Sequence, residues 1–284
     1  MRWMVTGAEG MLGADLVATL GDAGEEVTPT SRATLDVTDA DAVLDAVAGH
    51  DVVVNCAAWT AVDAAEDDEP AAWWVNALGP ANLARAASRV GARIVQVSTD
   101  YVVSGEAPDP LPADAAPHPL QAYGRTKLSG EWAVRAEAPA SHLVLRTAWL
   151  YGAHGACFPR TIVRVARERG SLDVVDDQWG QPTWTRDVAA LALAAVRQDV
   201  APGTYHATSS GRTSWWGFAR AAVAAAGMDP DVVRPSTSAT LDRRAVRPAW
   251  SVLDHGSLRA VGVEPIGDWE QRWAVAADEV LAGV

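Results

Sequence analysis

Short apolar runs alternate with longer stretches of helical periodicity through the first half of the chain. The run Asp51–Asn55 (DVVVN) is too apolar for a half-exposed strand and predicts a strand buried on both faces. Strands separated by helical segments of crossover length imply a parallel sheet, so the pattern predicts an α/β, doubly wound fold. The predicted strands are Arg2–Thr6, Glu26–Thr28, Asp51–Asn55, Arg93–Val97 and His142–Arg146, and the predicted helices are Met11–Ala23, Asp39–Ala48, Glu66–Arg89 and Gln121–Glu137.

After about residue 150 the pattern loosens into a mixture of short strands and helices. We expect residues 1–149 to form one domain and a helix and strand near 183–207 to return to it. Residues 150–182 and 208–284 should form mainly a smaller, mixed α/β domain over the carboxyl edge of the sheet. The segment Glu106–Pro119 contains five prolines and predicts an irregular loop rather than a linker. The predicted elements of this half are the helices Phe158–Arg169, Thr185–Arg197, Ser214–Ala226 and Asp268–Leu281 and the strands Ser171–Val175 and Thr204–Ala207.

Composition narrows the class of protein. With 49% hydrophobic and 21% charged residues the chain is typical of a globular protein, and its net charge of −13 argues against a nucleic-acid partner. The longest apolar run, Val188–Val196, is shorter than the ~18 residues that a membrane span needs, so no membrane partner is expected. Cys56 and Cys157 have neither disulfide nor metal-ligand spacing, so we expect no metal. Because the first predicted strand already begins at Arg2, we expect no signal peptide and a cytoplasmic protein.

A glycine-rich turn, GAEGMLG (7–13), follows the first strand directly and opens the first helix. Glycines permit a tight turn and let the backbone approach a pyrophosphate, which the free N–H groups of the helix N-terminus hold. Three glycines alone are a weak signal, and an ordinary strand–helix turn is the alternative. Their position at the first β→α junction predicts that Gly7, Gly10 and Gly13 bind a dinucleotide.

The residues after the second strand indicate which dinucleotide is preferred. A site selective for NAD places an acidic residue there for the ribose 2′-hydroxyl, whereas a site for NADP uses Arg or a hydroxyl near the 2′-phosphate. The acids Glu25 and Glu26 lie too early in the sequence for the first role. Ser31 and Arg32 therefore predict a preference for NADPH, with NADH left open and a merely solvated Arg32 as the alternative.

Tyr123 and Lys127 lie four residues apart on a predicted helix and so share one face. A nearby ammonium favours tyrosinate, so we expect Lys127 to draw the phenol pKa of Tyr123 down from its ordinary ~10. Such a tyrosine can protonate an alkoxide as it forms, and a hydroxyl of Ser98 or Thr99 can hydrogen-bond the same oxygen. A lone Y-x-x-x-K is usually a surface pair, but together with the glycine turn and the Ser98-Thr99 step it predicts a nicotinamide-dependent reductase.

With these motifs the chain resembles the extended short-chain dehydrogenases/reductases, and among them the dTDP-4-dehydrorhamnose reductases. The resemblance implies a Rossmann-like NADP(H)-binding domain and a substrate-binding domain. It also implies NADPH-dependent reduction of the C4 keto group of a dTDP-4-keto-6-deoxyhexose, foremost dTDP-4-dehydro-L-rhamnose to dTDP-L-rhamnose. The matching stretches are TGAEGMLG (6–13), NCAAWTAVDAAE (55–66), VNALGPANLA (75–84), VSTDYVVSG (97–105), PLQAYGRTKLSGE (119–131), RTAWLYG (146–152), DDQWGQPT (176–183) and RPAWSVLD (247–254).

The resemblance also implies roles for individual residues. Thr99, Tyr123 and Lys127 match the catalytic hydroxyl, acid and lysine of the family. Arg247 is the candidate ligand of the substrate pyrophosphate, with an interdomain salt bridge as the alternative. The implied cofactor contacts are Gly10, Met11, Leu12, Asp36, Val37, Ala58, Trp59, Thr60, Tyr123 and Lys127. The implied sugar contacts are Thr60, Val62, Asp63, Thr99, Asp100, Tyr101 and Trp149.

The chain departs from the family pattern at positions near the expected pocket. Trp59 stands where His or Tyr is expected, Val103 where Phe is, Gln121 where Asn is, and Cys157 where Asn is. These departures bear on the identity of the sugar more than on the reaction type. At Cys157 a small buried thiol is favoured over a nucleophile, because no companion base lies within reach in the sequence.

Tryptophan is unusually frequent, with 13 residues against 2 Phe and 4 Tyr. Core packing is the default for most of them. For those in or beside the matching motifs, a flat wall against a sugar, base or nicotinamide is the alternative, above all at Trp149. These are Trp59, Trp149, Trp179, Trp184 and Trp250.

Other functions compete with this interpretation. Sugar-nucleotide 4,6-dehydratases follow the catalytic Thr with Asp-Glu, whereas Thr99 and Asp100 are followed here by Tyr101, which leaves no carboxylate to act on C5. A ketoreductase for another dTDP-4-keto-deoxysugar has the same chemistry and stays open. A regulatory subunit of the methionine adenosyltransferase type also resembles the family, but the complete set of catalytic residues argues against it. A homodimer is left open.

Overall fold

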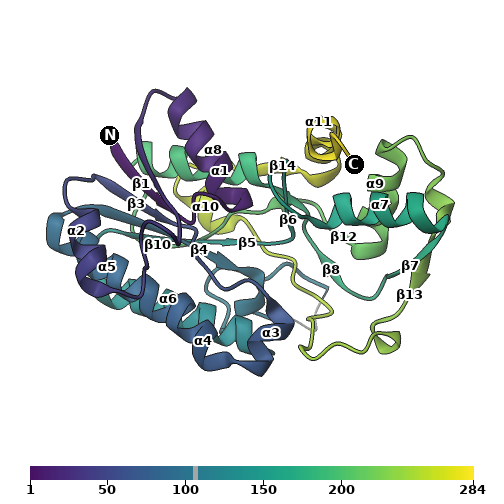
Figure 1. Cartoon of the computed structure of the whole chain (residues 1–284), viewed down its shortest axis with the longest axis horizontal. Coiled ribbons are helices and arrows are strands. Elements are labelled where there is room, and N and C mark those ends of the chain that lie inside the picture. The colour runs from purple at the N-terminus through teal and green to yellow at the C-terminus, as the bar shows by residue number, and fades with distance from the viewer. Residues whose placement is uncertain (105–107) are drawn as a thin grey trace.

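A computed structural model describes residues 1–104 and 108–284 as a large lobe built on one sheet and a smaller lobe beyond its end (Figure 1). Residues 106–107 of the predicted proline-rich loop and residue 105 of the VSTDYVVSG stretch lie outside the described residues. The six strands run parallel in the order β10-β5-β4-β3-β1-β2, which confirms the predicted doubly wound sheet. The strands are β1 (Arg2–Thr6), β2 (Glu26–Thr30), β3 (Val52–Asn55), β4 (Arg93–Thr99), β5 (His142–Thr147) and β10 (Gly203–His206).

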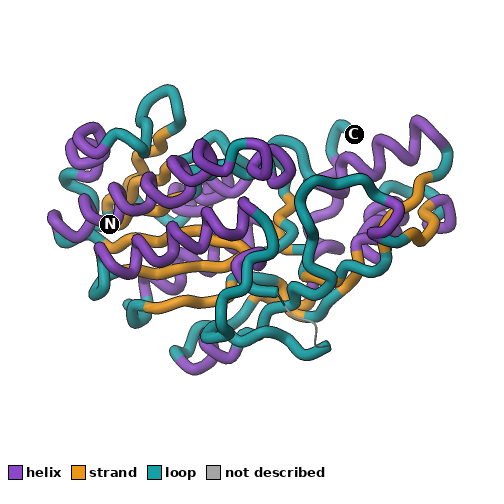
Figure 2. Tube along the Cα trace, turned by 90° about the horizontal axis from the view of Figure 1, so that it is seen from below, coloured by secondary structure: helices purple, strands orange, loops and turns teal. Residues whose placement is uncertain are grey.

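Successive residues of the central strands face opposite helix layers. Val52 and Val54 pack into one core cluster and Val53 into the other, so β3 is buried on both faces, as its apolar run predicts. Each such side chain stabilises the fold by about 1.5–3 kcal/mol on burial. Figure 2, which views the molecule from below, shows the helices of one of these layers alongside the strands. The first layer contains α1 (Met11–Asp22), α8 (Thr185–Arg197) and α10 (Gly256–Ala260), and the second contains α2 (Ala40–Val47), α5 (Gly79–Val90) and α6 (Ala122–Glu137).

The helical region predicted over Glu66–Arg89 is helical for most of its length, but it is interrupted at Asp68 and widens into a π-helical turn before Pro80. Asp68 ends one helix and caps the next, its carboxylate accepting the N–H of Ala71 at 3.0 Å. Farther along, Pro80 has no N–H for the carbonyl of Asn76, and the preceding turn widens into a π-helix. The resulting elements are α3 (Val62–Asp67), α4 (Glu69–Trp73), η1 (Trp74–Leu78) and then α5.

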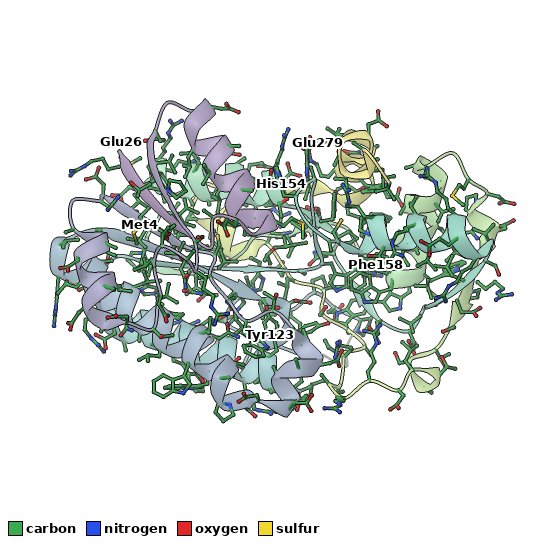
Figure 3. The ribbon with its side chains drawn as sticks, viewed as in Figure 1. Met4, Glu26, Tyr123, His154, Phe158 and Glu279 are labelled. Atoms are coloured by element: carbon green, nitrogen blue, oxygen red, sulfur yellow. The ribbon has the colours of Figure 1, made fainter. Side chains whose placement is uncertain are left out.

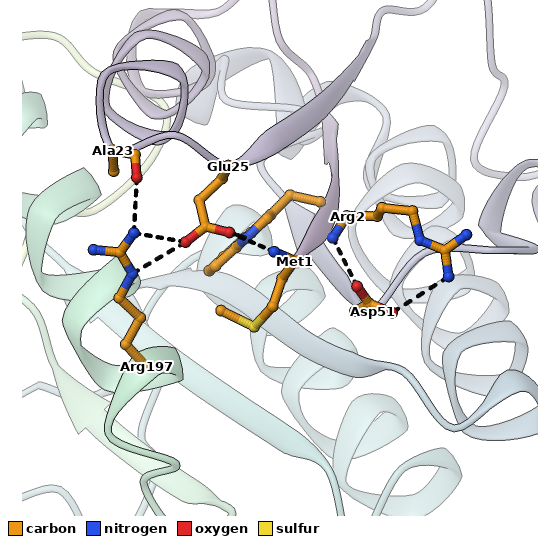
Figure 4. Close-up of polar contacts among 7 residues, drawn as sticks. Met1, Arg2, Ala23, Glu25, Asp51 and Arg197 are labelled. Carbon is orange, nitrogen blue, oxygen red and sulfur yellow. Dashed lines mark hydrogen bonds and ion pairs between the residues drawn. The ribbon is translucent and has the colours of Figure 1, made fainter.

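A buried carboxylate fastens the amino ends of the strands (Figure 4). Glu25 accepts hydrogen bonds from the Met1 amine at 2.8 Å, from Arg197 Nη2 at 2.7 Å and from the Trp3 indole at 3.1 Å. The Met1 ammonium and then the Arg197 guanidinium lower the pKa of Glu25 to about 2. These hydrogen bonds to Glu25 lie at the edge of the sheet opposite the carboxyl ends of the strands. Glu25, the acid that comes too early in the sequence to select NAD, therefore has a structural role here.

The smaller lobe packs three helices around an aromatic core that includes Phe218, Trp269 and Trp273. Ser214 caps the helix that follows it by accepting the N–H of Gly217 at 3.1 Å. The two-residue strands here are too short to give a periodicity, which is why the pattern misses them. The longer elements are α7 (Phe158–Arg169), β7 (Leu172–Val175), α9 (Trp215–Ala225), β13 (Val233–Ser236), β14 (Ile266–Asp268) and α11 (Trp269–Leu281). The short ones are η2 (Asp100–Val102), β6 (Leu150–Tyr151), β8 (Trp179–Gly180), β9 (Thr183–Trp184), β11 (Ser209–Ser210), β12 (Thr213–Ser214), η3 (Pro230–Val232) and η4 (Ser238–Thr240). Over the described ranges, no helix combines the length and apolar character that a bilayer crossing requires.

Candidate active site

A cavity of about 1050 Å³ lies at the carboxyl edge of the large sheet. In Figure 3, Tyr123 and His154 mark its place between the lobes, Tyr123 on the α6 side of the sheet and His154 on the α1 side. Most of the residues predicted from the sequence converge on this one cavity. They are Gly7, Gly10, Met11, Leu12, Gly13, Ser31, Arg32, Asp36, Val37, Ala58, Trp59, Thr60, Thr99, Asp100, Tyr123, Lys127 and Trp149.

The glycine turn forms a cradle that side chains would fill. Gly7 has a left-handed backbone with φ +64°, and a Cβ there would lie 2.8 Å from the backbone nitrogen of Ala57. A Cβ on Gly13 would lie 2.8 Å from the Cα of Ala8. The first N–H groups of α1 have no partner within the helix, and the helix dipole adds partial positive charge there. The turn can therefore hold an anionic group by backbone contacts alone.

The three predicted catalytic residues come from two elements that meet at the cavity. Thr99 ends β4, and its hydroxyl donates to Asp100 Oδ1 at 2.9 Å and accepts the N–H of Tyr101 at 3.1 Å. Tyr123 and Lys127 lie one turn apart on α6, with Lys127 Nζ donating to the carbonyl of Val97 at 2.7 Å. Lys127 is the only lysine in the 284 residues. All other residues counted among the 23 Lys and Arg are arginines, which do not titrate in the neutral range.

The predicted lowering of the Tyr123 pKa is wrong. Burial raises the pKa of the Tyr123 phenol well above its ordinary value, and the nearby Asp100 carboxylate adds to the rise. Burial also lowers the pKa of Lys127 to about 8, against the attraction of Glu131. The same desolvation raises the pKa of Asp100 to about 6. Tyr123 is thus protonated at neutral pH, which is the state that a proton donor requires.

Two buried polar residues support the site and escape motif reasoning. Asn76 accepts the N–H of Trp59 at 2.8 Å and donates to the carbonyl of Trp59 and to Thr126 Oγ1, each at 3.0 Å. Glu131, one turn after Lys127, accepts from Ser98 Oγ at 2.6 Å and from Arg146 Nε and Nη2 at 2.9 and 2.8 Å. Both lie within matching stretches of the sequence, but nothing in the stretches reveals their partners.

Four predicted sugar or phosphate ligands are missing from the described cavity lining, namely Val62, Asp63, Tyr101 and Arg247. Tyr101 lies close by, with its ring edge-on to Tyr123 at a centroid distance of 6.0 Å. Arg247 pairs instead with Asp63, Nη2 to Oδ2 at 2.7 Å. The guanidinium is therefore engaged within the protein, as the salt-bridge alternative expects.

The loop after β6 contributes cavity residues that the sequence did not indicate. His154, Gly155 and Ala156 line the cavity, just beyond the matching stretch that ends at Gly152. Trp74 of the π-helical turn lines it as well. In the sequence, only their closeness to a matching stretch points to these residues. A loop that reaches a site from a second lobe has no fixed spacing in sequence from the motifs of the first.

The tryptophans beside the motifs divide into two groups. Trp59 and Trp149 line the cavity. Trp184 is buried with the guanidinium groups of Arg186 and Arg272 over its ring, which is core packing. Trp179 and Trp250 pair with each other at 6.4 Å, away from the described cavity lining. Of these five tryptophans, only Trp59 and Trp149 can therefore form a wall against a ligand in this cavity.

The remaining departures from the family pattern are buried. Val103 packs in a small apolar cluster, and Gln121 immediately precedes α6. Cys157 is buried, and its Sγ donates to the carbonyl of Gly152 at 3.7 Å, which fits the predicted small buried thiol. Within residues 1–104 and 108–284, no three His, Cys, Asp or Glu side chains are grouped to hold a metal ion.

Comparison with known proteins identifies the family. The family model described as the RmlD substrate binding domain matches residues 1–281. A dTDP-4-dehydrorhamnose reductase of Streptomyces griseus is 47% identical over 274 residues, covering 94% of this chain and 90% of that protein. A dTDP-4-keto-6-deoxy-D-glucose reductase of Streptomyces niveus is 45% identical over 270 residues, covering 94% and 93%.

A solved structure agrees with the sequence relatives. The dTDP-4-dehydrorhamnose reductase of Bacillus anthracis, in complex with NADP, matches with a TM-score of 0.93 at 33% identity, covering 97% of this chain and 98% of that one. Fold, cavity and sequence similarity therefore agree along almost the whole chain. The protein belongs to the RmlD substrate binding domain family, within the extended short-chain dehydrogenases/reductases that its motifs predicted.

Proposed function

We propose that this protein reduces the C4 keto group of a dTDP-4-keto-6-deoxyhexose with NADPH, and that dTDP-4-dehydro-L-rhamnose is its substrate and dTDP-L-rhamnose its product. The observation that carries the proposal is the convergence of Thr99, Tyr123 and Lys127 with the glycine turn on one cavity. The similarity to the Streptomyces griseus reductase supports the choice of substrate. The central test measures NADPH oxidation in the presence of dTDP-4-dehydro-L-rhamnose and determines the stereochemistry of the product by NMR.

The residues at the cavity fit NADPH. The glycine turn at the start of α1 supplies backbone N–H groups for the pyrophosphate, with no side chain in the way. Ser31 and Arg32, which also line the cavity, offer a hydroxyl and a guanidinium for the 2′-phosphate. The Bacillus anthracis relative was solved with NADP, which supports the same choice here. When bound, NADPH supplies the hydride.

The chain's own residues then handle the proton and the developing charge. Tyr123, held protonated by its buried surroundings, donates its proton to the C4 oxygen. Thr99 Oγ1 lies beside it and donates a hydrogen bond to the same oxygen once it turns from Asp100. An ammonium has three N–H donors, and Lys127 uses one of them on the carbonyl of Val97. The other two are left for ribose hydroxyls of the cofactor.

A second candidate is a reductase for another dTDP-4-keto-deoxysugar. The Streptomyces niveus relative, named a dTDP-4-keto-6-deoxy-D-glucose reductase, favours it at nearly the same identity. The departure at Trp59, which lines the cavity, is consistent with a different sugar. A panel of dTDP-4-keto sugars that differ in configuration at C3 and C5 separates the two, because turnover with only one configuration names the substrate.

We also infer a division of labour between the lobes. Residues 1–149, together with 183–207, hold the cofactor, and residues 150–182 and 208–284 mainly hold the substrate. The membership of β10 in the large sheet and the packing of α8 on α1 support this assignment. We further propose that the protein works in the cytoplasm, which is consistent with its two free cysteines. Its assembly into a homodimer stays a prediction that light scattering can test.

A further inference from the structure

The chain leaves the large sheet at Trp149 through an unusual bend. Trp149 lies between β5 and β6 with a left-handed backbone of φ +45°. Such a conformation is strained for a bulky residue and persists only when the surroundings hold it. Because Trp149 also lines the cavity, the neighbours that hold it decide what surface the cavity presents.

Trp215, the first residue of α9, is one of these neighbours. Its ring stacks on that of Trp149, with the centroids 3.6 Å apart and the planes 9° from parallel. Phe158, the first residue of α7, packs against the Trp215 ring at 4.4 Å. The described cavity lining includes Trp149 but not Trp215. Trp215 therefore acts on the cavity through Trp149 and ties this wall to two helices of the smaller lobe.

Gly180 provides the room that the stacked ring needs. It ends β8 and pairs with Thr213 of β12, two residues before Trp215. A Cβ on Gly180 would lie 2.6 Å from Cζ2 and 2.7 Å from Nε1 of Trp149. Any side chain at this position would therefore push the indole from its place. Residues from two separate segments, 180 and 215, thus converge on the orientation of one side chain.

We propose that Trp215 is a positioning residue, which together with the space at Gly180 fixes the Trp149 indole between them in the cavity wall, beside the sugar of the substrate. This inference rests on the proposed function, since the sugar is the group that Trp149 would face. Because its two sides are held by Trp215 and Gly180, the indole keeps one place in the cavity wall and so limits how the sugar lies relative to Tyr123. Displacing the ring should weaken sugar binding while leaving the cofactor's contacts intact.

The test compares variants at both positions in the full-length protein. In Trp215→Leu and in Gly180→Ala we expect KM for the dTDP-4-keto sugar to rise about tenfold. The Kd for NADPH and the inhibition constant for dTDP alone should change by less than about twofold, because the inference places the indole against the sugar rather than against the cofactor or the nucleotide. Trp215→Phe keeps a stacking ring and should restore most of the loss.

The neighbouring residue gives a matched control. The indole of Trp216 donates to the carbonyl of Val233 at 3.0 Å and carries Arg220 over its ring, away from the described cavity lining. Trp216→Leu should therefore leave KM unchanged, even where it lowers the melting temperature. A wild-type KM in both Trp215→Leu and Gly180→Ala would overturn the inference. So would an equal loss of sugar and NADPH binding, which would reveal a merely structural role.

The two proposals fail in different ways. If the inference alone is wrong, the wild-type protein reduces a dTDP-4-keto sugar and the variants bind it equally well. If wild-type protein with intact NADPH binding reduces none of these sugars, the proposed function is wrong and this inference falls with it.

Discussion

Arg247 and Asp63 form a two-pronged ion pair, with Nη1 2.9 Å from Oδ1 and Nη2 2.7 Å from Oδ2. Asp63 also accepts the N–H of Ala245 at 3.1 Å, and hydrogen bonding to Arg247 holds the pKa of its carboxyl below the ordinary range. The pair fastens an irregular segment of the C-terminal half to α3 of the large lobe. It therefore acts as a strap between two parts of the chain that are 184 positions apart.

Removing either partner of this ion pair should lower the stability of the protein. Because Asp63 is half exposed, we expect Arg247→Ala and Asp63→Ala each to lower the free energy of unfolding by about 1 kcal/mol. The double variant should lose little more than one single variant, since both remove the same contact. Urea unfolding of the four proteins measures this coupling. Unchanged stability together with a large rise in KM for Arg247→Ala would instead restore the pyrophosphate role that the sequence suggested.

Removal of the Tyr123 hydroxyl should abolish most of the chemistry. We expect Tyr123→Phe to lower kcat by about 10²–10⁴-fold, because general acid catalysis typically contributes that much. The Kd for NADPH should stay near that of the wild type. Tyr205→Phe is the control, since that hydroxyl donates to the carbonyl of Ala201 and Tyr205 is absent from the described cavity lining. Near-normal kcat in Tyr123→Phe would remove Tyr123 from its role as the acid.

Arg32 should set the choice between the two nicotinamide cofactors. It lines the cavity near Asp36, whose pKa is lowered mainly by hydrogen bonds from Thr38 and in smaller part by the charge of Arg32. We expect Arg32→Ala to reduce kcat/KM for NADPH about tenfold or more, through loss of a charge-assisted contact to phosphate. The kcat/KM for NADH should hardly change, because NADH has no 2′-phosphate for Arg32 to contact. A wild-type protein that prefers NADH, or a variant that loses both cofactors equally, would contradict the assignment.

The pH dependence should follow Lys127. Burial lowers its pKa to about 8, so the ammonium is charged below that pH and is lost as the pH rises through it. Burial moves the pKa of Tyr123 the other way, so the phenol adds no falling limb in this range. We therefore expect kcat/KM to fall above pH 8 or so, by about tenfold per pH unit.

The titration can be read at the lysine itself. Lys127 is the only lysine in the chain, so protein labelled with isotopic lysine gives one side-chain resonance to follow by NMR. Its midpoint should lie near 8. A midpoint at the ordinary 10.5 would show that burial does not control this group.

Local patterns account for the parts of the protein that the sequence predicts well. The run at Val52–Asn55 marks a doubly buried strand, and the spacing of Tyr123 and Lys127 places both on one helix face. Such features depend on near neighbours in the sequence. The break at Asp68 and the π-helical turn before Pro80 were missed because the surrounding alanine-rich composition is equally compatible with one long helix.

Long-range contacts account for the rest. The partner of Arg247 lies 184 positions away, and the ring that stacks on Trp149 belongs to a different lobe. The pKa of Tyr123 depends on how deeply the folded chain buries it, and the motif reveals only that a cation is near. Spacing therefore predicts which residues meet at the site, whereas burial and distant partners decide their charge and orientation.

The most direct test of the account follows NADPH oxidation by the purified wild-type protein with dTDP-4-dehydro-L-rhamnose. The proposed function predicts substrate-dependent oxidation of NADPH and a product that NMR identifies as dTDP-L-rhamnose. Turnover restricted to a dTDP-4-keto sugar of another configuration would keep the chemistry and change the substrate. NADPH binding without oxidation in the presence of any dTDP-4-keto sugar would contradict the assignment of this site as a sugar-nucleotide 4-ketoreductase.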